Sequence, residues 1–252
     1  MANERYTQRR SGTETSSFGT PGRINHDSTK FYKSRLYEGL RSKKKVRYVE
    51  NRIPEKNVNK IFCKSSEKMD ELPDNSVHLM ITSPPYPMIE MWDDMFRSAI
   101  PEVDQIWKKM ENETDDKKKE EYIDRIYELI HEYLGKVWKE TYRVLVDGGI
   151  ACINIGDATR KMNGIFRLFP NHSKIIEICE KIGFVTLPYI IWKKPTNKPN
   201  AFLGSGFLPT NGYVTLDVEY ILIFRKNGPR KFPPKDPLRY ASKFTKEERD
   251  VW

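Results

Sequence analysis

The tetrapeptide Ser83-Pro84-Pro85-Tyr86 is the part of the sequence whose residue types and spacing are best suited to chemistry. Each proline fixes its own φ angle and biases the preceding residue toward extended backbone, so the carbonyl groups of Ser83 and Pro84 are held in preset directions. The serine hydroxyl is another hydrogen-bond acceptor, and the tyrosine adds an aromatic ring. Because such acceptors need no ordering when a ligand arrives, the sequence predicts a rigid polar binding loop.

Ordered acceptors of this kind suit the methylation of an exocyclic amine on a nucleobase. The lone pair of that nitrogen is delocalised into the ring, which makes it a poor nucleophile. Hydrogen bonds from its two N–H groups to Ser83 Oγ and to the Pro84 carbonyl would favour a pyramidal nitrogen whose lone pair faces an incoming methyl group. We expect Tyr86 to stack on the base, which has to leave the duplex to reach the loop. The alternative interpretation is a diproline loop that merely ends a strand.

The loop follows the apolar run Val77–Thr82, which is partly β-branched and comes after the turn-like segment Pro73-Asp74-Asn75-Ser76. This pattern predicts a buried strand. In open α/β sheets, ligands bind outside the carboxyl ends of the strands. The predicted strand therefore delivers the tetrapeptide to the edge of a sheet where a site is expected.

The segment 61–92 resembles motif IV, the catalytic region of the beta-class amino-methyltransferases of DNA. Its form, Thr82 followed by the tetrapeptide, resembles the cytosine-N4 branch, whereas adenine-N6 enzymes more often carry Asp or Asn in place of Ser83. Other blocks of the sequence resemble this family in the same order: Asn25–Ser28 with Phe31-Tyr32, Glu71–Val77, Tyr142–Leu145 with Gly148-Gly149, Ile191–Pro195 and Glu219–Phe224.

The resemblance implies an α/β fold of the Rossmann-like, S-adenosylmethionine-dependent methyltransferase type, with a mixed sheet that contains an antiparallel hairpin. It implies S-adenosylmethionine as cofactor, double-stranded DNA as partner, a restriction-modification setting and no metal. The residues to which it assigns catalysis are Ser83, Pro84, Pro85 and Tyr86. Those expected to contact the cofactor are Ser65, Thr82 and Asp157. For Asp157, positioning of the target strand and a plain turn remain alternative roles.

The charge distribution favours contact with nucleic acid. The formal net charge is +9, with +7 in residues 1–50, +6 in residues 193–252 and −4 between them. Basic ends around a mildly acidic centre are typical of a protein that holds phosphates with its flanks. The candidate DNA-binding residues are Arg41, Lys43, Lys44, Lys45, Lys193 and Lys194. The alternative is that the lysine-rich ends only increase solubility.

Composition excludes several other classes of protein. No apolar run approaches the roughly 18 residues that span a membrane, and no secretory signal is visible, so we expect a cytoplasmic protein. The three cysteines, Cys63, Cys152 and Cys179, show no paired spacing and are interpreted as buried thiols rather than disulfide or zinc ligands. None of them follows a proline, which argues against a carbon-5 cytosine methyltransferase.

The sequence predicts three parts: a disordered basic arm over 1–22, a catalytic domain over 23–230, and the start of a target-recognition or linker region over 231–252. Apolar residues at helical spacing predict a long helix over Asp115–Leu145 that packs on the sheet. A shorter helix is expected over His172–Gly183. The predicted strands are Ile150–Ile155 after a Gly148-Gly149 turn, then Phe184–Lys194 and Tyr213–Lys226 as a hairpin.

The family's glycine-rich cofactor motif is not found in this sequence. The segment Phe202–Gly206 imitates it but lies between two predicted strands, so a mobile loop near DNA is favoured. Lys64 stands where relatives often have Asp. Because the family places its cofactor motifs last, we expect a fold that is incomplete at the C-terminus, with the glycine motif on a second chain or a missing C-terminal region. Three alternatives remain: an adenine-N6 DNA methyltransferase, a protein or RNA amine methyltransferase, and a DNA-binding subunit that is inactive alone.

Overall fold

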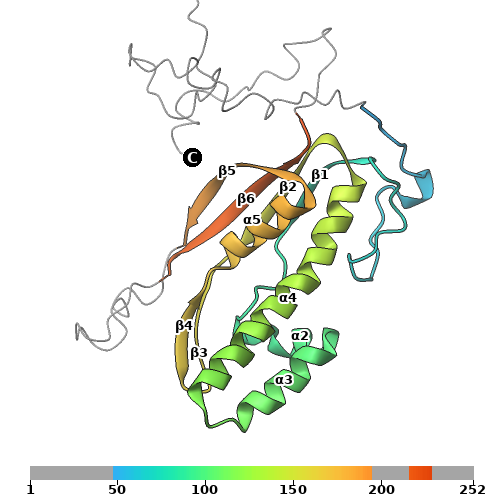
Figure 1. The fold of residues 1–252 in the computed structure, drawn as a ribbon. Helices are drawn as coiled ribbons and strands as arrows, with labels where there is room; N and C mark the ends of the chain where they lie inside the picture. The colour runs from blue at the N-terminus through green and yellow to red at the C-terminus, as the bar shows by residue number, and fades with distance from the viewer. Residues whose placement is uncertain (1–47, 195–215, 229–252) are drawn as a thin grey trace, which may run out of the picture. The chain divides into compact units, whose positions relative to one another are not determined.

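The computed structural model describes residues 48–194 and 216–228, all within one compact unit, Val46–Trp252 (Figure 1). The predicted basic arm, the Arg41–Lys45 cluster, the Phe202–Gly206 segment and the region 231–252 lie outside the described residues. Across the described ranges, no helix is both long enough and apolar enough to cross a membrane.

A mixed four-stranded sheet forms the centre of the fold. Its strands are β1 (Val77–Thr82), β2 (Leu145–Ile155), β5 (Phe184–Lys193) and β6 (Val218–Lys226), in the order β1-β2-β6-β5. β1 runs parallel to β2, whereas β6 pairs antiparallel with both β2 and β5. The predicted mixed α/β fold with an antiparallel hairpin is thereby confirmed. Residues 213–215 of the second predicted hairpin strand lie outside the described residues.

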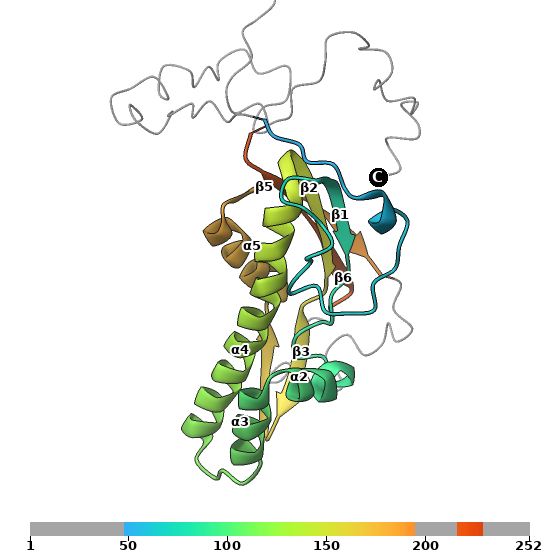
Figure 2. The ribbon, with the colours of Figure 1, turned by 90° about the vertical axis from the view of Figure 1, so that its right-hand side faces the viewer.

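Two helices cover the same face of this sheet, α4 (Asp116–Val144) and α5 (Asn171–Ile182) (Figure 2). Asp115 caps α4 by accepting a 2.8 Å hydrogen bond from the Lys117 backbone N–H. α5 ends before Gly183, which adopts the left-handed conformation at φ 116°. Both helices agree with the sequence prediction. The residues whose spacing predicted α4 are all buried or partly buried: Ile123, Ile126, Tyr127, Ile130, Leu134, Val137, Trp138 and Thr141.

A second core lies beyond the sheet, in what we call the helical lobe. It consists of the short helices α2 (Asp93–Ala99) and α3 (Pro101–Glu111), the hairpin of β3 (Ala158–Met162) and β4 (Ile165–Phe169), and the first half of α4 (Figure 1). At 1.5 Å per residue, α4 is about 44 Å long, so it can contribute to both cores. Only its C-terminal half packs on the sheet. The 3-10 turns η3 (Glu55–Asn57) and η4 (Glu90–Trp92) complete the described elements.

Two local expectations about the strands are corrected by the structure. β1 is an edge strand of the described sheet rather than a buried one, with Leu79 52% and Ile81 72% exposed. Gly148-Gly149 is no turn before a strand but lies inside β2. Here the pairing with β1 shifts register, and a side chain on Gly149 would meet the Val146 carbonyl oxygen at 2.8 Å.

The cysteines also differ from the prediction. Cys179 is buried, and burial raises the pKa of its thiol. Cys152 is only partly buried, and Cys63 is exposed because it lies in the loop before β1 rather than in a packed element. The prediction of three buried thiols is therefore wrong for Cys63 and only partly right for Cys152.

Candidate active site

The Ser83-Pro84-Pro85-Tyr86 loop leaves the carboxyl end of β1 beside the last residues of β2, where Thr82 pairs with Ile153. After the loop, Met88 inserts into the core of the helical lobe at 2% exposure. Its φ of 63° is unusual for a residue that is not glycine, so packing must hold it there. The loop is therefore fixed at both ends, by the sheet and by the lobe. Ser83 itself is exposed.

Asn171, the first residue of α5, anchors the backbone directly after the loop. Its side chain is fully buried and its amide group donates to two carbonyl oxygens, those of Pro87 at 2.9 Å and Gly156 at 3.0 Å. Its own carbonyl oxygen lies 3.2 Å from His131 Nε2. Because that oxygen can only accept, Nε2 must carry the imidazole proton. Burial lowers the pKa of His131 to about 4, so the ring is neutral.

Tyr86 is held by polar side chains of β2 and β6. Its hydroxyl donates to Glu219 Oε2 at 3.1 Å and accepts from Asn154 Nδ2 at 2.8 Å. The same amide donates to Glu219 Oε2 at 2.7 Å. Ser83 Oγ donates to the Tyr86 hydroxyl at 3.3 Å. The serine of the loop is thus linked through a tyrosine to a carboxylate on β6.

The electrostatics of this cluster favour an anionic glutamate and a neutral tyrosine. Burial raises the pKa of Tyr86, and the charge of Glu219 raises it further. Burial also acts to raise the pKa of Glu219, but hydrogen bonds from Asn154, Lys194 and Tyr86 outweigh it and hold that pKa below its usual value. Lys194 supplies the compensating cation, with its Nζ 3.2 Å from Glu219 Oε1.

Asp157 lies two residues after Ile155, the last residue of β2, and its side chain is 5% exposed. Its carboxylate accepts from the His172 backbone N–H at 3.0 Å and lies 2.7 Å from His172 Nδ1. The His172 ring stacks on Tyr220, with centroids 4.0 Å apart. Asp157 therefore orders the start of α5 in this structure, and it does not line the cavity beside Ser83.

A cavity of about 230 Å³ opens next to the loop. It brings two predicted cofactor residues, Ser65 and Thr82, together with Ser83. Its apolar wall comes from α4. Within the same loop, Ser65 Oγ donates to Glu67 Oε1 at 3.0 Å. The full lining is Ser65, Ser66, Thr82, Ser83, Pro84, Pro85, Met95, Tyr133, Leu134, Val137 and Trp138.

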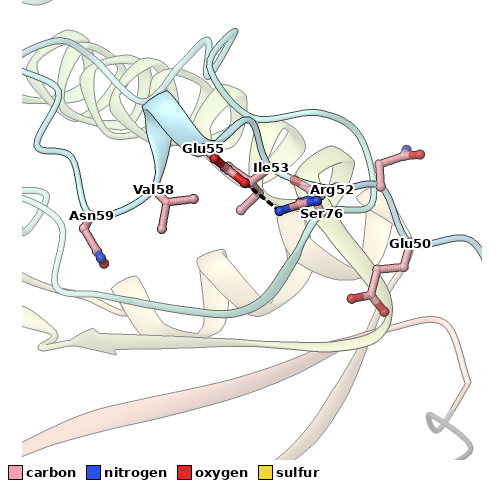
Figure 3. Close-up of a pocket in the computed structure, with 8 residues that line it drawn as sticks. Glu50, Arg52, Ile53, Glu55, Val58, Asn59 and Ser76 are labelled. Atoms are coloured by element: carbon pink, nitrogen blue, oxygen red, sulfur yellow. Dashed lines mark hydrogen bonds and ion pairs between the residues drawn. The ribbon is translucent and has the colours of Figure 1, made fainter.

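A larger cavity of about 590 Å³ lies at the opposite end of β1, before Val77 (Figure 3). Its walls include Ser76, Glu50 and the ion pair of Arg52 with Glu55, at 2.7 Å. A six-residue strand is about 20 Å long, so this cavity is well separated from Ser83. Since ligands of α/β sheets bind at the carboxyl ends of strands, the smaller cavity is the candidate active site.

The predicted DNA-binding residues fall into three groups. Arg41, Lys43, Lys44 and Lys45 lie outside the described residues. Lys193 is 81% exposed, and its Nζ is 3.9 Å from Asp217. Lys194 pairs with Glu219, and its Nζ lies 3.7 Å from the centroid of the Trp192 ring.

Sequence reasoning missed three residues of the site: Asn154, Asn171 and Glu219. Asn154 and Glu219 each had a detectable signal, because each is a polar side chain in or beside an apolar strand and faces away from the helices. Asn171 follows Pro170 at the start of a helix, a position where a polar residue normally indicates only a cap. Its contacts span 84 and 40 residues, which no local pattern reveals.

Comparisons with known proteins show what the chain is similar to. The profile of a family described as DNA methylase matches residues 77–252. The type II methyltransferase M.MjaI of Methanocaldococcus jannaschii is 72% identical over 193 residues, which are 77% of this chain and 64% of M.MjaI. M.MthZI of Methanothermobacter thermautotrophicus, also a type II methyltransferase, is 46% identical over 199 residues, 78% of this chain and 53% of that protein. The chain therefore spans less than two thirds of the length of these relatives.

One solved structure from Thermus thermophilus is described as a DNA modification methylase in complex with S-adenosyl-L-methionine. It is 30% identical, with a TM-score of 0.41, and the match covers 65% of this chain and 53% of that one.

The family match supports S-adenosylmethionine as the cofactor. The cavity beside Ser83 suits part of that molecule, because it combines serine and threonine hydroxyls with apolar side chains of α4. At about 230 Å³ it is smaller than the roughly 300 Å³ at which ordinary small-molecule sites begin. The described residues therefore fit one end of the cofactor rather than the whole of it.

Proposed function

This chain belongs to the DNA methylase family, and from that premise we propose that it provides the catalytic part of a type II DNA methyltransferase of a restriction-modification system. The proposed reaction transfers a methyl group from S-adenosylmethionine to the exocyclic N4 amine of cytosine in double-stranded DNA. The observation that carries this proposal is the loop at the carboxyl end of β1, where an exposed Ser83 stands beside the 230 Å³ cavity.

In the proposed mechanism, Ser83 Oγ and the Pro84 carbonyl accept hydrogen bonds from the two N–H groups of the target amine. Both acceptors belong to a loop that is fixed at its two ends, so little ordering is needed when the base arrives. The bound cofactor supplies a methyl group on a positively charged sulfur atom. By accepting hydrogen bonds from both N–H groups, Ser83 and Pro84 would turn the nitrogen lone pair toward that methyl group. The sulfur would keep the electron pair of the broken S–C bond, and the surplus proton of the amine would leave to water.

Ser65 and Thr82 are the described residues that we propose to contact the cofactor, because both line the cavity beside Ser83. We propose that Asp157 acts on the cofactor site only indirectly, by ordering the start of α5. Its carboxylate binds His172 and does not line the cavity. The glycine-rich part of the cofactor site is proposed to come from a further region of the protein or a second chain. The smaller size of the described cavity and the greater length of the relatives support this.

Calorimetric titration of the folded chain with S-adenosylmethionine tests whether the cofactor site needs a further region or a second chain. We expect no saturable binding by residues 1–252 alone. Saturable binding would contradict the need for a further region. A Thr82→Val variant that abolishes such binding would then assign the whole cofactor site to this chain, whereas Thr159→Val, an exposed change on β3, serves as the matched control.

The choice of cytosine rests on Ser83, because the resemblance associates a serine at this position with the cytosine-N4 branch. Mass analysis of nucleosides from DNA that has been exposed to the active protein tests it. We expect N4-methylcytosine. Finding N6-methyladenine instead would replace the proposed base while leaving the loop mechanism intact, since both target atoms are exocyclic amines.

Ser83→Ala tests the mechanism more directly. The substitution removes one acceptor of the amine, so we expect methyl transfer to fall by at least about 100-fold while Kd for DNA changes by less than about twofold. The magnitude follows from the loss of an oriented group, which acts on kcat rather than on binding. A parallel loss of DNA affinity and of folded structure would mean that Ser83 has a structural role.

Among the predicted DNA-binding residues, Lys193 is the one that we propose to contact DNA phosphate, because it is 81% exposed and its Nζ lies 3.9 Å from Asp217. We expect Lys193→Ala to weaken DNA binding equally for all sequences and to reduce the salt slope of log Kd by about 0.9. Lys136→Ala is the matched control, since that lysine is exposed on α4 and paired with Glu67. Equal salt slopes for the parent protein and Lys193→Ala would exclude the contact.

A further inference from the structure

A continuous line of hydrogen bonds runs from the catalytic loop to β6. It begins at Ser83 Oγ, passes through the Tyr86 hydroxyl at 3.3 Å, and ends at Glu219 Oε2 at 3.1 Å. None of the sequence motifs assigns a role to Glu219, and its side chain is only 18% exposed. The glutamate is therefore linked by two hydrogen bonds to Ser83 Oγ, the group proposed to accept a hydrogen bond from the target amine.

The direction of these hydrogen bonds is fixed by the chemistry of the groups. An ionised carboxylate has no proton to give, so Tyr86 must donate to Glu219. Asn154 Nδ2 also donates to Glu219 Oε2, at 2.7 Å, and to the Tyr86 oxygen, at 2.8 Å. The proton of Ser83 is then directed at the remaining acceptor site of the Tyr86 oxygen. The lone pairs of Ser83 Oγ are left for a ligand.

We propose that Glu219 is a positioning residue that sets the hydrogen-bond direction of Ser83, so that its hydroxyl presents lone pairs to an amine and withholds its own proton. This inference rests on the proposed function, because it gives a reason for the acceptor role of Ser83 in amine methylation. Without the glutamate, the serine hydroxyl can rotate and point its proton at the substrate nitrogen, which repels an N–H group and competes for the lone pair.

The charge of Glu219 is maintained by its surroundings. Lys194 Nζ lies 3.2 Å from the other carboxylate oxygen, and Asn154 donates to the first. Gly156 permits this close assembly, since a side chain there would lie 3.1 Å from the Tyr86 ring and 3.5 Å from Glu219 Cγ. β2, β6 and the catalytic loop thus meet at one carboxylate.

Glu219→Gln is the decisive substitution, because it keeps the size of the side chain but removes the charge. The glutamine amide can donate to the Tyr86 oxygen, which reverses the direction of the line. Glu121→Gln is the matched control, as Glu121 is an exposed residue on α4. Glu219→Asp keeps the charge and serves as the conservative variant.

The first measurement needs no catalytic activity. Carbon NMR of the tyrosine Cζ atoms, with the Tyr86 signal assigned by its loss in Tyr86→Phe, follows the ionisation of that phenol in the full chain. Its pKa is raised by burial and by the charge of Glu219. We expect Glu219→Gln to lower the pKa of Tyr86 and Glu121→Gln to leave it unchanged. An unchanged pKa in Glu219→Gln would overturn the inference.

The second measurement uses methyl-transfer kinetics of the active protein, with its further region or partner chain. We expect Glu219→Gln to lower kcat by about 10- to 100-fold, with KM for DNA within about twofold, and Glu219→Asp to restore part of kcat. In a Ser83→Ala background, Glu219→Gln should have no further effect, because the two residues act through one group. Independent, multiplicative effects would overturn the inference.

The two measurements separate this inference from the function on which it rests. If Tyr86 responds to Glu219 but the complete protein transfers no methyl group to DNA, the proposed function fails while the hydrogen-bond line stands. If the complete protein methylates DNA and Glu219→Gln retains full kcat, the function stands and the role of Glu219 falls.

Discussion

The two faces of the central sheet differ sharply in how the described residues cover them. On the face that packs against α4 and α5, which we call the covered face, the strand residues Ala151, Ile153, Leu222 and Phe224 are 0–1% exposed. On the opposite or open face, Leu79, Ile81, Ile190 and Trp192 are 46–72% exposed. Both faces are nonetheless built from apolar and β-branched side chains.

The difference shows that the strands have the apolar pattern of a sheet that is covered on both faces, whereas the described residues cover only one face. Strands buried on both faces have near-continuous apolar sequences, whereas strands that face water on one side alternate with polar residues. Tyr220–Phe224 of β6 is apolar throughout. The candidate site lies where the faces meet, because Asn171 holds the loop from the covered side and Glu219 holds it from the open side.

The largest difference in stability is expected between tryptophan-to-alanine substitutions in the core of the covered face and on the open face. Trp138 is 1% exposed in the core between α4 and the sheet, so Trp138→Ala should lower the free energy of unfolding by about 3–5 kcal/mol. Trp192 is 46% exposed on the open face, with only Lys194 over its ring among the described residues. Trp192→Ala should therefore lower it by about 1 kcal/mol or less. Urea unfolding followed by circular dichroism measures both.

The comparison would be broken if the two tryptophan substitutions had equal effects. That result would mean that the open face is covered in solution by residues outside the described ranges. A large effect of Trp192→Ala that appears only when a further region or partner chain is present would instead identify the cover as that region.

A pH-dependent contrast is expected from His131, which lies on the covered side and is fully buried. Its pKa is lowered to about 4 by burial, against about 6.5 in an unfolded chain. Because the folded state disfavours the protonated ring, this contribution to stability is complete above about pH 6.5 and is lost as the pH falls toward 4. The loss should reach about 3 kcal/mol, which is the size of the pKa shift expressed as free energy.

His131→Gln tests this contribution, because a glutamine amide can still donate to Asn171 but does not titrate in this range. Urea unfolding at pH 7, 6, 5 and 4.5 should show a steeper loss of stability in the parent protein than in the variant. Parallel pH profiles would mean that His131 is protonated at little cost, and that the neutral ring assigned from its contact with Asn171 is incorrect.

The strands of the sheet and the helices that cover it could be predicted from sequence because their signals are local. The apolar spacing of α4, the left-handed Gly183 and the run before Ser83 each specify structure within a few residues. Strand pairing and the polar contacts of the site could not be predicted in this way. The Tyr86–Glu219 contact joins residues 133 positions apart, and only the antiparallel return of β6 beside β2 creates it.

The helical lobe was missed although one of its signals is local. Asn163 and Gly164 both have positive φ, 41° and 92°, which is the backbone of a two-residue hairpin turn, and Asn-Gly is the sequence that favours it. The flanking segments, Ala158–Met162 and Ile165–Phe169, are short and contain three basic residues, so they lack a clear apolar strand pattern. α2 and α3 are also short, and their apolar faces are evident only once packed.

A smaller effect is expected where the two faces meet, at Gly156. A side chain there would lie 3.1 Å from the Tyr86 ring, so the ring must shift by a few tenths of an ångström. We expect Gly156→Ala to lower the free energy of unfolding by about 1 kcal/mol. It should also shift the NMR signal of Tyr86. Gly228→Ala is the matched control, because nothing lies within 4 Å of the added methyl group. An unshifted Tyr86 signal in Gly156→Ala would mean that the loop is not held against β2.

The smallest effect on stability is expected at the exposed edge strand. Ile81 is 72% exposed, so Ile81→Thr should change the free energy of unfolding by less than about 0.5 kcal/mol. Ile153 pairs with the neighbouring Thr82 but is 1% exposed, and Ile153→Thr should destabilise by several times more because it buries a hydroxyl. Ile81→Thr should also reduce self-association of the chain in sedimentation velocity, since an edge strand with exposed apolar side chains can pair with another chain. Strong destabilisation by Ile81→Thr would place this residue in a core, and the open face would then have to be covered by this chain itself.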